Sequence, residues 1–265
     1  MDRRLRKGII MAAGSGSRLS PTTLAVSKHL FPVFNKPMIY YPLTTLMLAG
    51  IKEILIITCP EHLDAYKKLL KDGDQWGITL TYATQNKPKG IADGLLIARE
   101  FLQSCPSLLI LGDNIFFGDA LPSILRRTSI ETNATILSYR VKDPERYAVV
   151  SLDKHGKINC IKEKPEKPST NEVVTGIYYL PENAAELAST ISPSERGELE
   201  ITDVLNLYLA EGRLKNIRLG RGMTWFDVGT YSSLLEASQY ISVLESRQGQ
   251  KIAWPDEIAG SIRPQ

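Results

Sequence analysis

Residues 8–19 read Gly-Ile-Ile-Met-Ala-Ala-Gly-Ser-Gly-Ser-Arg-Leu, an apolar run that passes straight into a loop of small residues. Gly8 to Ala12 has the length and composition of a buried strand. A Gly/Ser loop directly after a strand lets backbone N–H groups approach an anion, and a helix after the loop would add its positive end. The segment therefore indicates an α/β fold with an anion-binding loop, and a plain tight turn is the alternative.

Two common phosphate-binding templates do not fit this loop. The dinucleotide fingerprint G-x-G-x-x-G needs a glycine at the position of Leu19, and the P-loop sequence Gly-Lys-Ser/Thr is absent. Arg18 nevertheless favours a phosphate ligand, because a guanidinium binds phosphate oxygens in a bidentate manner. Lys28 is a second cation close by in the sequence, and an exposed surface lysine is its ordinary alternative.

Strand-like and helical runs alternate through the first half of the chain. The expected strands are 8–12, 54–58, 79–83 and 108–111, and the expected helices are 37–49, 63–70 and 91–101. Strands that alternate with helices of this length predict βαβ units and a mainly parallel sheet.

The second half is richer in strands. The expected strands are 135–141, 148–152, 157–161 and 175–179, with a hairpin turn at 153–156 and helices at 202–210 and 231–245. Thr202 is the expected N-cap of the first of these helices. No repeat or linker divides the chain, so we expect one α/β domain with a mixed sheet and inserted β structure.

The composition is that of an ordinary globular protein. Apolar residues make up 43% and charged residues 23% of the 265 residues, and the net charge of +3 is too small to suggest a nucleic-acid partner. The longest apolar stretches are far shorter than the ~20 residues of a membrane span. The apolar part after the basic segment Met1 to Lys7 is too short for a signal peptide, and the three cysteines resemble reduced thiols. We therefore expect a cytoplasmic protein without a membrane partner.

Two aspartates follow apolar segments. Asp113 comes just after the strand 108–111, at the strand end where open α/β sheets bind ligands, and Asp227 lies between apolar residues and Gly229. Two carboxylates that meet in space suit Mg²⁺, whereas each alone is explained by a turn cap or a helix cap. The three histidines lack the spacing of a zinc site.

A charged segment later in the chain suggests a sugar phosphate. Glu163 can accept hydrogen bonds from sugar hydroxyls, and Lys164 can pair with a phosphate. An ordinary solvated loop is the alternative, because Lys162, Glu166 and Lys167 surround them.

Seven blocks in the same order give the chain a family resemblance. They are 12–19 (AAGSGSRL), 36–42 (KPMIYYP), 111–116 (LGDNIF), 143–147 (DPERY), 163–165 (EKP), 174–178 (VTGIY) and 196–203 (RGELEITD). From about Gly8 to Ala259 the chain resembles the bacterial glucose-1-phosphate thymidylyltransferases of the sugar-phosphate nucleotidylyltransferase family.

The resemblance implies a Rossmann-like three-layer α/β/α fold with a mostly parallel mixed central sheet and a small inserted β region that binds sugar. It implies one domain over 1–265, with a nucleotide-binding part at about 8–115, a sugar-binding part at about 116–230 and a C-terminal helical part at about 231–265. It also implies a homo-oligomer of two or four chains.

The implied reaction condenses dTTP with α-D-glucose 1-phosphate to dTDP-glucose and pyrophosphate, with Mg²⁺ as cofactor. A sugar phosphate is already an anionic nucleophile at pH 7, so the protein's task is alignment and charge neutralisation.

The resemblance also implies a role for each site residue. Arg18 and Lys28 hold the triphosphate, Asp113 and Asp227 hold Mg²⁺, and Lys164 binds the sugar phosphate. The nucleotide-binding set is Ala12, Ala13, Gly14, Ser15, Gly16, Ser17, Arg18, Lys28, Gln85, Gly90 and Asp113, with Gln85 and Gly90 facing the base. The sugar-phosphate set is Asn114, Tyr147, Ala148, Glu163, Lys164, Val174, Thr175, Gly176 and Trp225.

The chain departs from the common family pattern at four places. Ala13 stands where many relatives have glycine, and its methyl group is expected to crowd a phosphate. His29 replaces glutamine, Ala148 replaces glycine, and Ile91-Ala92-Asp93-Gly94 replaces Leu-Ala-Gln-Ala. These three favour, as an alternative, an enzyme that uses UTP or another sugar 1-phosphate. A catalytically silent nucleotide-sugar sensor is a second alternative, and the presence of Arg18, Lys28, Asp113, Lys164 and Asp227 argues against it.

Overall fold

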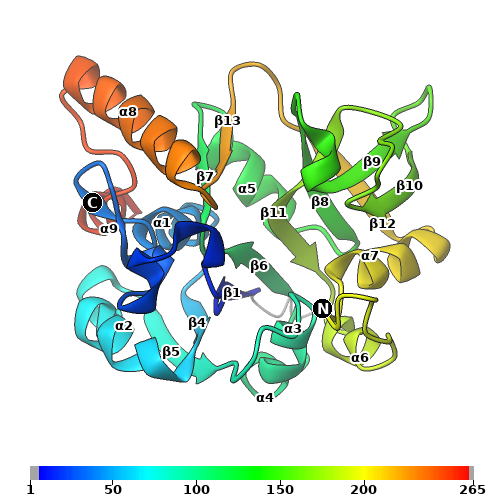
Figure 1. Cartoon of the computed structure of the whole chain (residues 1–265), viewed down its shortest axis with the longest axis horizontal. Helices are drawn as coiled ribbons and strands as arrows, with labels where there is room; N and C mark the ends of the chain where they lie inside the picture. Colours follow the sequence, from blue (N-terminus) through cyan, green and yellow to red (C-terminus); the bar gives the residue numbers. More distant parts are fainter. Residues whose placement is uncertain (1–5, 263–265) are drawn as a thin grey trace.

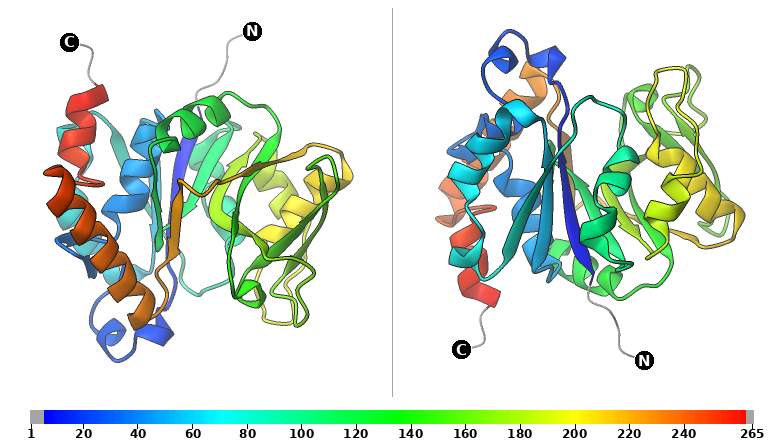
Figure 2. Two further views of the ribbon diagram at one scale, coloured as in Figure 1. Left: turned by 90° about the horizontal axis from the view of Figure 1, so that it is seen from above. Right: turned by 90° about the horizontal axis from the view of Figure 1, so that it is seen from below.

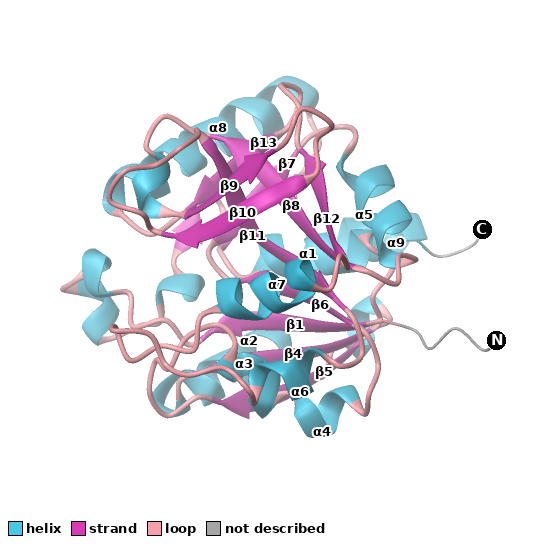
Figure 3. Ribbon diagram, turned by 90° about the vertical axis from the view of Figure 1, so that its right-hand side faces the viewer, coloured by secondary structure: helices cyan, strands magenta, loops and turns pink. Residues whose placement is uncertain are grey.

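A nine-stranded mixed sheet forms the centre of the computed structural model, which describes residues 6–262 (Figure 1). Four parallel strands lie side by side in the order β5 (Thr79–Thr84), β4 (Glu53–Thr58), β1 (Lys7–Ala12) and β6 (Ser107–Leu111) (Figure 3). They make up the expected parallel half of the sheet.

The antiparallel half begins at β11 (Glu172–Leu180), which pairs with β6. Beyond it lie β8 (Ala134–Arg140), β12 (Leu214–Arg218), β9 (Ala148–Leu152) and β10 (Ile158–Glu163). Two short ribbons are separate: β7 (Asn114–Phe117) with β13 (Thr224–Asp227), and β2 (Pro32–Val33) with β3 (Lys36–Pro37).

Helices cover both faces of the sheet (Figure 2). One face packs against α1 (Tyr40–Leu48), α2 (Leu63–Leu70), α5 (Leu121–Ser129) and α9 (Pro255–Ile262). The other packs against α3 (Asp93–Ile97), α4 (Arg99–Leu102), α6 (Ala184–Ala188) and α7 (Ile201–Ala210). The predicted three-layer fold is confirmed.

The sequence of β1 explains why it lies between the two layers. Ile10 and Ala12 belong to the core under α1, whereas Ile9 and Met11 belong to the core under α3. A strand buried on both faces needs a continuous apolar run rather than an alternating one. A third, smaller core lies between α8 (Tyr231–Gln248) and the β7–β13 ribbon.

Most predicted elements are present, and the differences have local causes. The helix expected at 37–49 starts at Tyr40, because Lys36–Pro37 pairs with Pro32–Val33 in a short hairpin. The helix expected at 91–101 is divided into α3 and α4.

Two expectations about helix ends are wrong. Thr202 does not cap α7; Glu200 precedes the helix, and Thr202 is buried in its first turn. No α-helix follows the Gly/Ser loop either, because Ser17–Leu19 forms only a 3₁₀ turn.

In the described part of the chain, no helix combines the length and apolar character that a membrane crossing requires. Cys59, Cys105 and Cys160 carry free thiols. Most of the basic segment Met1 to Lys7, and the last three residues of the C-terminal helical part, lie outside the described residues.

Candidate active site

The strand ends of β1 and β6 bring the Gly/Ser loop and Asp113 together. Met11 is paired with Leu111 in the parallel ladder, and the Gly112 N–H donates to the Met11 carbonyl over 2.8 Å. The loop that follows β1 and the carboxylate that follows β6 therefore leave the sheet at the same edge.

The Gly/Ser loop lies against the side chain of Lys28. A Cβ on Gly14 would be 3.6 Å from Lys28 Cε and 3.7 Å from its Nζ. Gly16 has a φ of 63°, which favours glycine. Ala13 is only 3% exposed, so little of its surface faces a ligand, and crowding of a phosphate by its methyl group stays a prediction.

Lys28 and Asp113 form a buried ion pair between Nζ and Oδ2, and each residue is 9% exposed. The surface-lysine alternative is therefore wrong. Burial raises the pKa of Asp113, but the charge of the Lys28 ammonium and its hydrogen bond outweigh burial and bring the pKa to about 2. The carboxylate is ionised at any physiological pH.

Asn114 connects this ion pair to the second half of the sheet. Its Nδ2 donates to Asp113 Oδ1 over 3.0 Å, and its Oδ1 accepts from Gly176 N at 3.0 Å and Trp225 Nε1 at 2.6 Å. A Cβ on Gly176 would overlap Asn114 Oδ1, so this position requires glycine. Asn114 thus fixes the orientation of the Asp113 carboxylate.

Asp227 reaches the same place through the β7–β13 ribbon. It is paired with Asn114, and the next residue, Val228, donates its N–H to the Asp113 carbonyl over 2.9 Å. Burial and the negative charge of Asp113 raise the pKa of Asp227 to about 6.

The helix-cap alternative for Asp227 does not hold. Thr230 and Ser233 form a capping box at the start of α8, so Asp227 is not needed there.

The two carboxylates fit Mg²⁺. The negative charge of Asp113 acts on Asp227, a divalent cation would relieve this repulsion, and carboxylate oxygens are its preferred protein ligands. Within residues 6–262, no three or more His, Cys, Asp or Glu side chains are grouped so that they could hold a metal. The remaining ligands would come from substrate phosphates and water.

Arg18 lies beside the segment that carries Asp227. Its guanidinium contacts the Gly229 backbone so closely that a Cβ there would be 2.6 Å from Nη2. The side chain is exposed and its charge acts on Asp227. Asp227 is thus influenced by three charged side chains from separate segments of the chain: Asp113, Lys28 and Arg18.

An aromatic wall of two residues from the predicted sugar-phosphate set lies beside Asp227. The rings of Tyr147 and Trp225 meet edge to face with their centroids 5.2 Å apart. Burial and the charge of Asp227 raise the pKa of Tyr147 to about 12. Tyr147 therefore stays protonated and able to donate a hydrogen bond near Asp227.

Three residues of the predicted sugar set serve the sheet through their side chains. Ala148 and Val174 are buried in the core beneath α7. The Thr175 hydroxyl donates to the Leu137 carbonyl over 2.9 Å. Their predicted contact with sugar would have to come from the backbone.

Glu163 is the last residue of β10, and Lys164 follows it beside Tyr147. The Lys164 N–H donates to the Tyr147 carbonyl over 3.1 Å, and Glu163 Oε1 lies 3.8 Å from Lys164 Nζ and 3.4 Å from Arg196 Nη2. Burial raises the pKa of Glu163.

Arg196 is a cation that sequence reasoning did not assign to the site. It belongs to the RGELEITD block, but a single arginine in a charged loop gives no local signal of its partners.

The residues predicted to face the base follow β5. Gln85 is 5% exposed, and its N–H donates to the carbonyl of Thr58 at the end of β4. Gly90 has a φ of 98°, and a Cβ there would overlap the Leu199 backbone, so glycine is required. Asp93 is a departure from the family pattern that sequence reasoning did not assign to the site. In the structure its carboxylate oxygen Oδ2 lies 2.7 Å from Gln85 Nε2.

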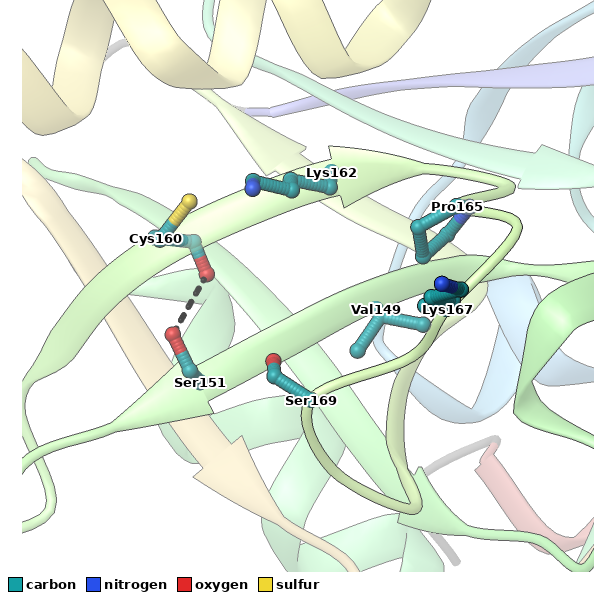
Figure 4. A pocket seen from close by; sticks show the side chains of 7 residues that line it. All are labelled: Val149, Ser151, Cys160, Lys162, Pro165, Lys167 and Ser169. Atoms are coloured by element: carbon teal, nitrogen blue, oxygen red, sulfur yellow. Dashed lines mark hydrogen bonds between the residues drawn. The ribbon is translucent and has the colours of Figure 1, made fainter.

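A small cavity of about 140 Å³ lies on the β9–β10 ribbon, apart from these residues (Figure 4). It is lined by Val149, Ser151, Cys160, Lys162, Pro165, Lys167 and Ser169. Pro165, Lys167 and Ser169 belong to the loop that follows Lys164, the predicted sugar-phosphate ligand, so this loop forms one wall of the cavity.

The chain matches the Nucleotidyl transferase family model over residues 7–243. A glucose-1-phosphate thymidylyltransferase of Xanthomonas campestris is 52% identical over 96% of this chain and 86% of its own. Those of Neisseria gonorrhoeae and Mycolicibacterium smegmatis are 48% and 44% identical over 96% of this chain and 88% of their own.

Two solved structures are similar to this chain in fold. A Bacillus anthracis structure described as a glucose-1-phosphate thymidylyltransferase in complex with sucrose has a TM-score of 0.82 at 40% identity, over 89% of this chain and 94% of that one. A UDP-glucose pyrophosphorylase with bound UDP-glucose has a TM-score of 0.80 at 24% identity over 91% and 99%, which shows the shared fold alone. The chain belongs to the nucleotidyl transferase family and, within it, to the glucose-1-phosphate thymidylyltransferases.

Proposed function

We propose that the protein condenses dTTP with α-D-glucose 1-phosphate to give dTDP-glucose and pyrophosphate. The observation that carries the proposal is the buried Lys28–Asp113 pair with Asp227 beside it, at the carboxyl edge of the parallel strands. A structural ion pair would not need a second, uncompensated carboxylate next to it.

The chemistry asks for alignment rather than for a base. A phosphate oxygen of the sugar phosphate attacks the α-phosphorus of dTTP in line, a new P–O bond forms, and the bond to the bridging oxygen breaks as pyrophosphate leaves. The attacking oxygen is already anionic at neutral pH, so no proton has to be removed. The barrier is lowered by positioning and by neutralising the phosphates.

Each half of the site supplies cations for one substrate. Arg18 and Lys28, with the backbone of the Gly/Ser loop, would bind the triphosphate. Lys164, assisted by Arg196 through Glu163, would bind the sugar phosphate. Asp113 and Asp227 would hold Mg²⁺, which when bound neutralises charge on the reacting phosphates.

The predicted contacts to base and sugar would lie on either side of this centre. Gln85 and Gly90 would face the base. The aromatic wall of Tyr147 and Trp225, with Glu163, would border the sugar.

Pyrophosphate release tests the proposal. Purified protein is offered dTTP or UTP with glucose 1-phosphate, with Mg²⁺ or with a chelator, after its folding has been checked. Turnover that needs the metal and prefers dTTP supports the proposal. Silence with both nucleotides in a folded protein refutes it and favours the sensor, provided that nucleotide still binds.

Two of the three departures that favoured an enzyme using UTP are buried side chains. His29, the first of them, is 2% exposed and hydrogen-bonded within the core, so its side chain has little surface with which to contact a base. Ala148 is likewise a core residue. Asp93 is the departure that lies beside a predicted base contact.

We further propose a cytoplasmic location and a homo-oligomer of two or four chains. Free cysteines and a nucleoside triphosphate substrate support the first. Family membership supports the second, and light scattering on the purified protein tests it.

A further inference from the structure

The side-chain amide of Gln85 has its orientation fixed by the protein. One amide atom lies 2.7 Å from Asp93 Oδ2 and 3.3 Å from the Gly90 carbonyl oxygen. An ionised carboxylate and a carbonyl can only accept hydrogen bonds. The atom that faces both must therefore be the NH₂ nitrogen.

This orientation leaves Gln85 with one kind of free hydrogen-bonding group. Both hydrogens of the amide nitrogen are used by Asp93 and Gly90, so Oε1 remains as an acceptor. Among the described residues, no protein donor is bonded to Oε1. A ligand that meets Gln85 at Oε1 must bring a donor of its own.

We infer that Asp93 is a specificity-determining positioning residue, which holds Gln85 so that the site takes a pyrimidine with an N3–H and rejects cytosine. The inference rests on the proposed function, in which Gln85 faces the base. Thymine and uracil carry a hydrogen on N3, whereas N3 of cytosine is an acceptor. Cytosine would place a lone pair against Oε1, and this acceptor would remain unpaired when the base covers it.

The position of Asp93 is itself fixed from two sides. Ala92, just before it, donates its N–H to the Leu199 carbonyl over 3.1 Å. Gly94, just after it, lies so close to Met11 Sδ that a Cβ would overlap the sulfur. The first turn of α3 therefore cannot shift without disturbing the segment that leads into α7 or β1, and the carboxylate stays against Gln85.

The identity of the residue matters as much as its place. Glutamine, the more familiar residue here in the family resemblance, has a donor and an acceptor end, so only the longer contact with the Gly90 carbonyl would still favour one orientation of Gln85. A carboxylate has only acceptors and allows one orientation. Its charge also strengthens the hydrogen bond that sets that orientation.

The test compares nucleotide preference in matched variants. Wild type, Asp93→Asn and Glu100→Gln are assayed for kcat and KM with dTTP, UTP and CTP at saturating glucose 1-phosphate and Mg²⁺. Glu100 is exposed on α4, so its variant removes one charge nearby without touching Gln85.

In Asp93→Asn we expect the preference for dTTP over CTP in kcat/KM to fall on the order of tenfold or more, mainly through KM. The Glu100→Gln variant should keep the wild-type ratio. A ratio that is unchanged in folded Asp93→Asn overturns the inference. A loss of kcat with all three nucleotides in parallel also overturns it, because that result indicates a purely structural role.

Binding separates this inference from the proposed function. Calorimetry with dTTP and CTP, without sugar phosphate, measures base preference in a protein that does not turn over. If wild type releases no pyrophosphate but binds dTTP better than CTP, and Asp93→Asn narrows the gap, the inference holds while the proposed function fails. If Gln85→Ala binds both nucleotides with the wild-type ratio, Gln85 does not read the base and the inference is refuted.

Discussion

Replacing Asp227 by asparagine should stabilise the metal-free protein and strongly reduce its turnover. Asp227 is held beside the ionised Asp113 and has a pKa of about 6, above the ordinary 3.8. A raised pKa means that the native state resists ionisation of this carboxyl more than the unfolded chain does. Asparagine keeps the shape of the side chain and removes the charge.

The magnitude follows from the two pKa values. At pH 7 the difference between 3.8 and about 6 corresponds to about 3 kcal/mol of destabilisation by the ionised carboxylate. Asp227 keeps some exposure, so solvent screening reduces this figure, and we expect a gain of about 1–3 kcal/mol in the free energy of unfolding.

Because the pKa of Asp227 is raised in the native state, its effect on the free energy of unfolding changes between about pH 4 and pH 6. The native state holds the proton of Asp227 between about pH 4 and 6 while the unfolded chain loses it, so this group lowers stability as the pH rises through that range. Above about pH 6 the penalty is constant. The advantage of Asp227→Asn should therefore be full at pH 7.5 and fall to about a third at pH 4.5.

Urea unfolding in the presence of a chelator measures this advantage at the two pH values. Turnover with Mg²⁺ should fall by about 10²-fold or more in the same variant, because a charged group at the reacting phosphates is lost. Mg²⁺ should raise the melting temperature of wild type only.

The Asp113→Asn variant is the matched control and should have the opposite sign. Asp113 is paired with Lys28 and has a pKa of about 2, so its ionised form stabilises the fold at neutral pH. Its removal leaves a buried ammonium without a partner and costs about 3 kcal/mol or more. Two results for Asp227→Asn would refute the electrostatic account. One is a lower free energy of unfolding than wild type at pH 7.5, and the other is a gain over wild type of the same size at pH 7.5 and pH 4.5.

Three further substitutions distinguish residues that serve the active site from residues that stabilise the fold. Arg18→Ala should lower kcat/KM strongly in pyrophosphate release, yet leave the melting temperature within a few degrees, because the side chain is exposed. Gly176→Ala should damage both folding and turnover, since its methyl group would displace Asn114 Oδ1; calorimetric melting and activity measure the two losses. Thr230→Ala should cost about 1 kcal/mol in urea unfolding through the loss of the α8 cap while turnover stays near wild type.

The parallel core of the fold could be predicted from local sequence. The runs at 8–12, 54–58 and 108–111 are apolar on both faces because these strands lie between two helical layers. A short, continuous apolar run bordered by turn residues is typical of such a doubly covered strand.

The convergence of the charged residues could not be predicted in the same way. Asp113 and Asp227 meet through the β7–β13 ribbon, whose strands are far apart in the sequence and carry no strong strand signal. Lys28 is buried by a partner 85 residues away, and nothing near it in the sequence distinguishes it from a surface lysine. Only the family resemblance joined these residues.

His29 and Asp93 show why a departure from a family pattern has no fixed meaning. Both replace a glutamine close to a predicted substrate contact. Burial lowers the pKa of His29 to about 3, and its Nδ1 lies 3.2 Å from both the Ser27 and the Tyr66 hydroxyl oxygens, so it is neutral and its hydrogen bonding is directed into the core.

Asp93, in contrast, uses its carboxylate to orient a neighbouring amide whose Oε1 meets no donor within the described chain. The first substitution can act on the nucleotide only indirectly, through the neighbouring Lys28 and through the packing of the His29 ring against Gly112. The second changes the hydrogen-bonding groups that a ligand meets. Substrate preference should therefore follow Asp93, because selectivity between bases depends on donors and acceptors at the contact and not on packing behind it.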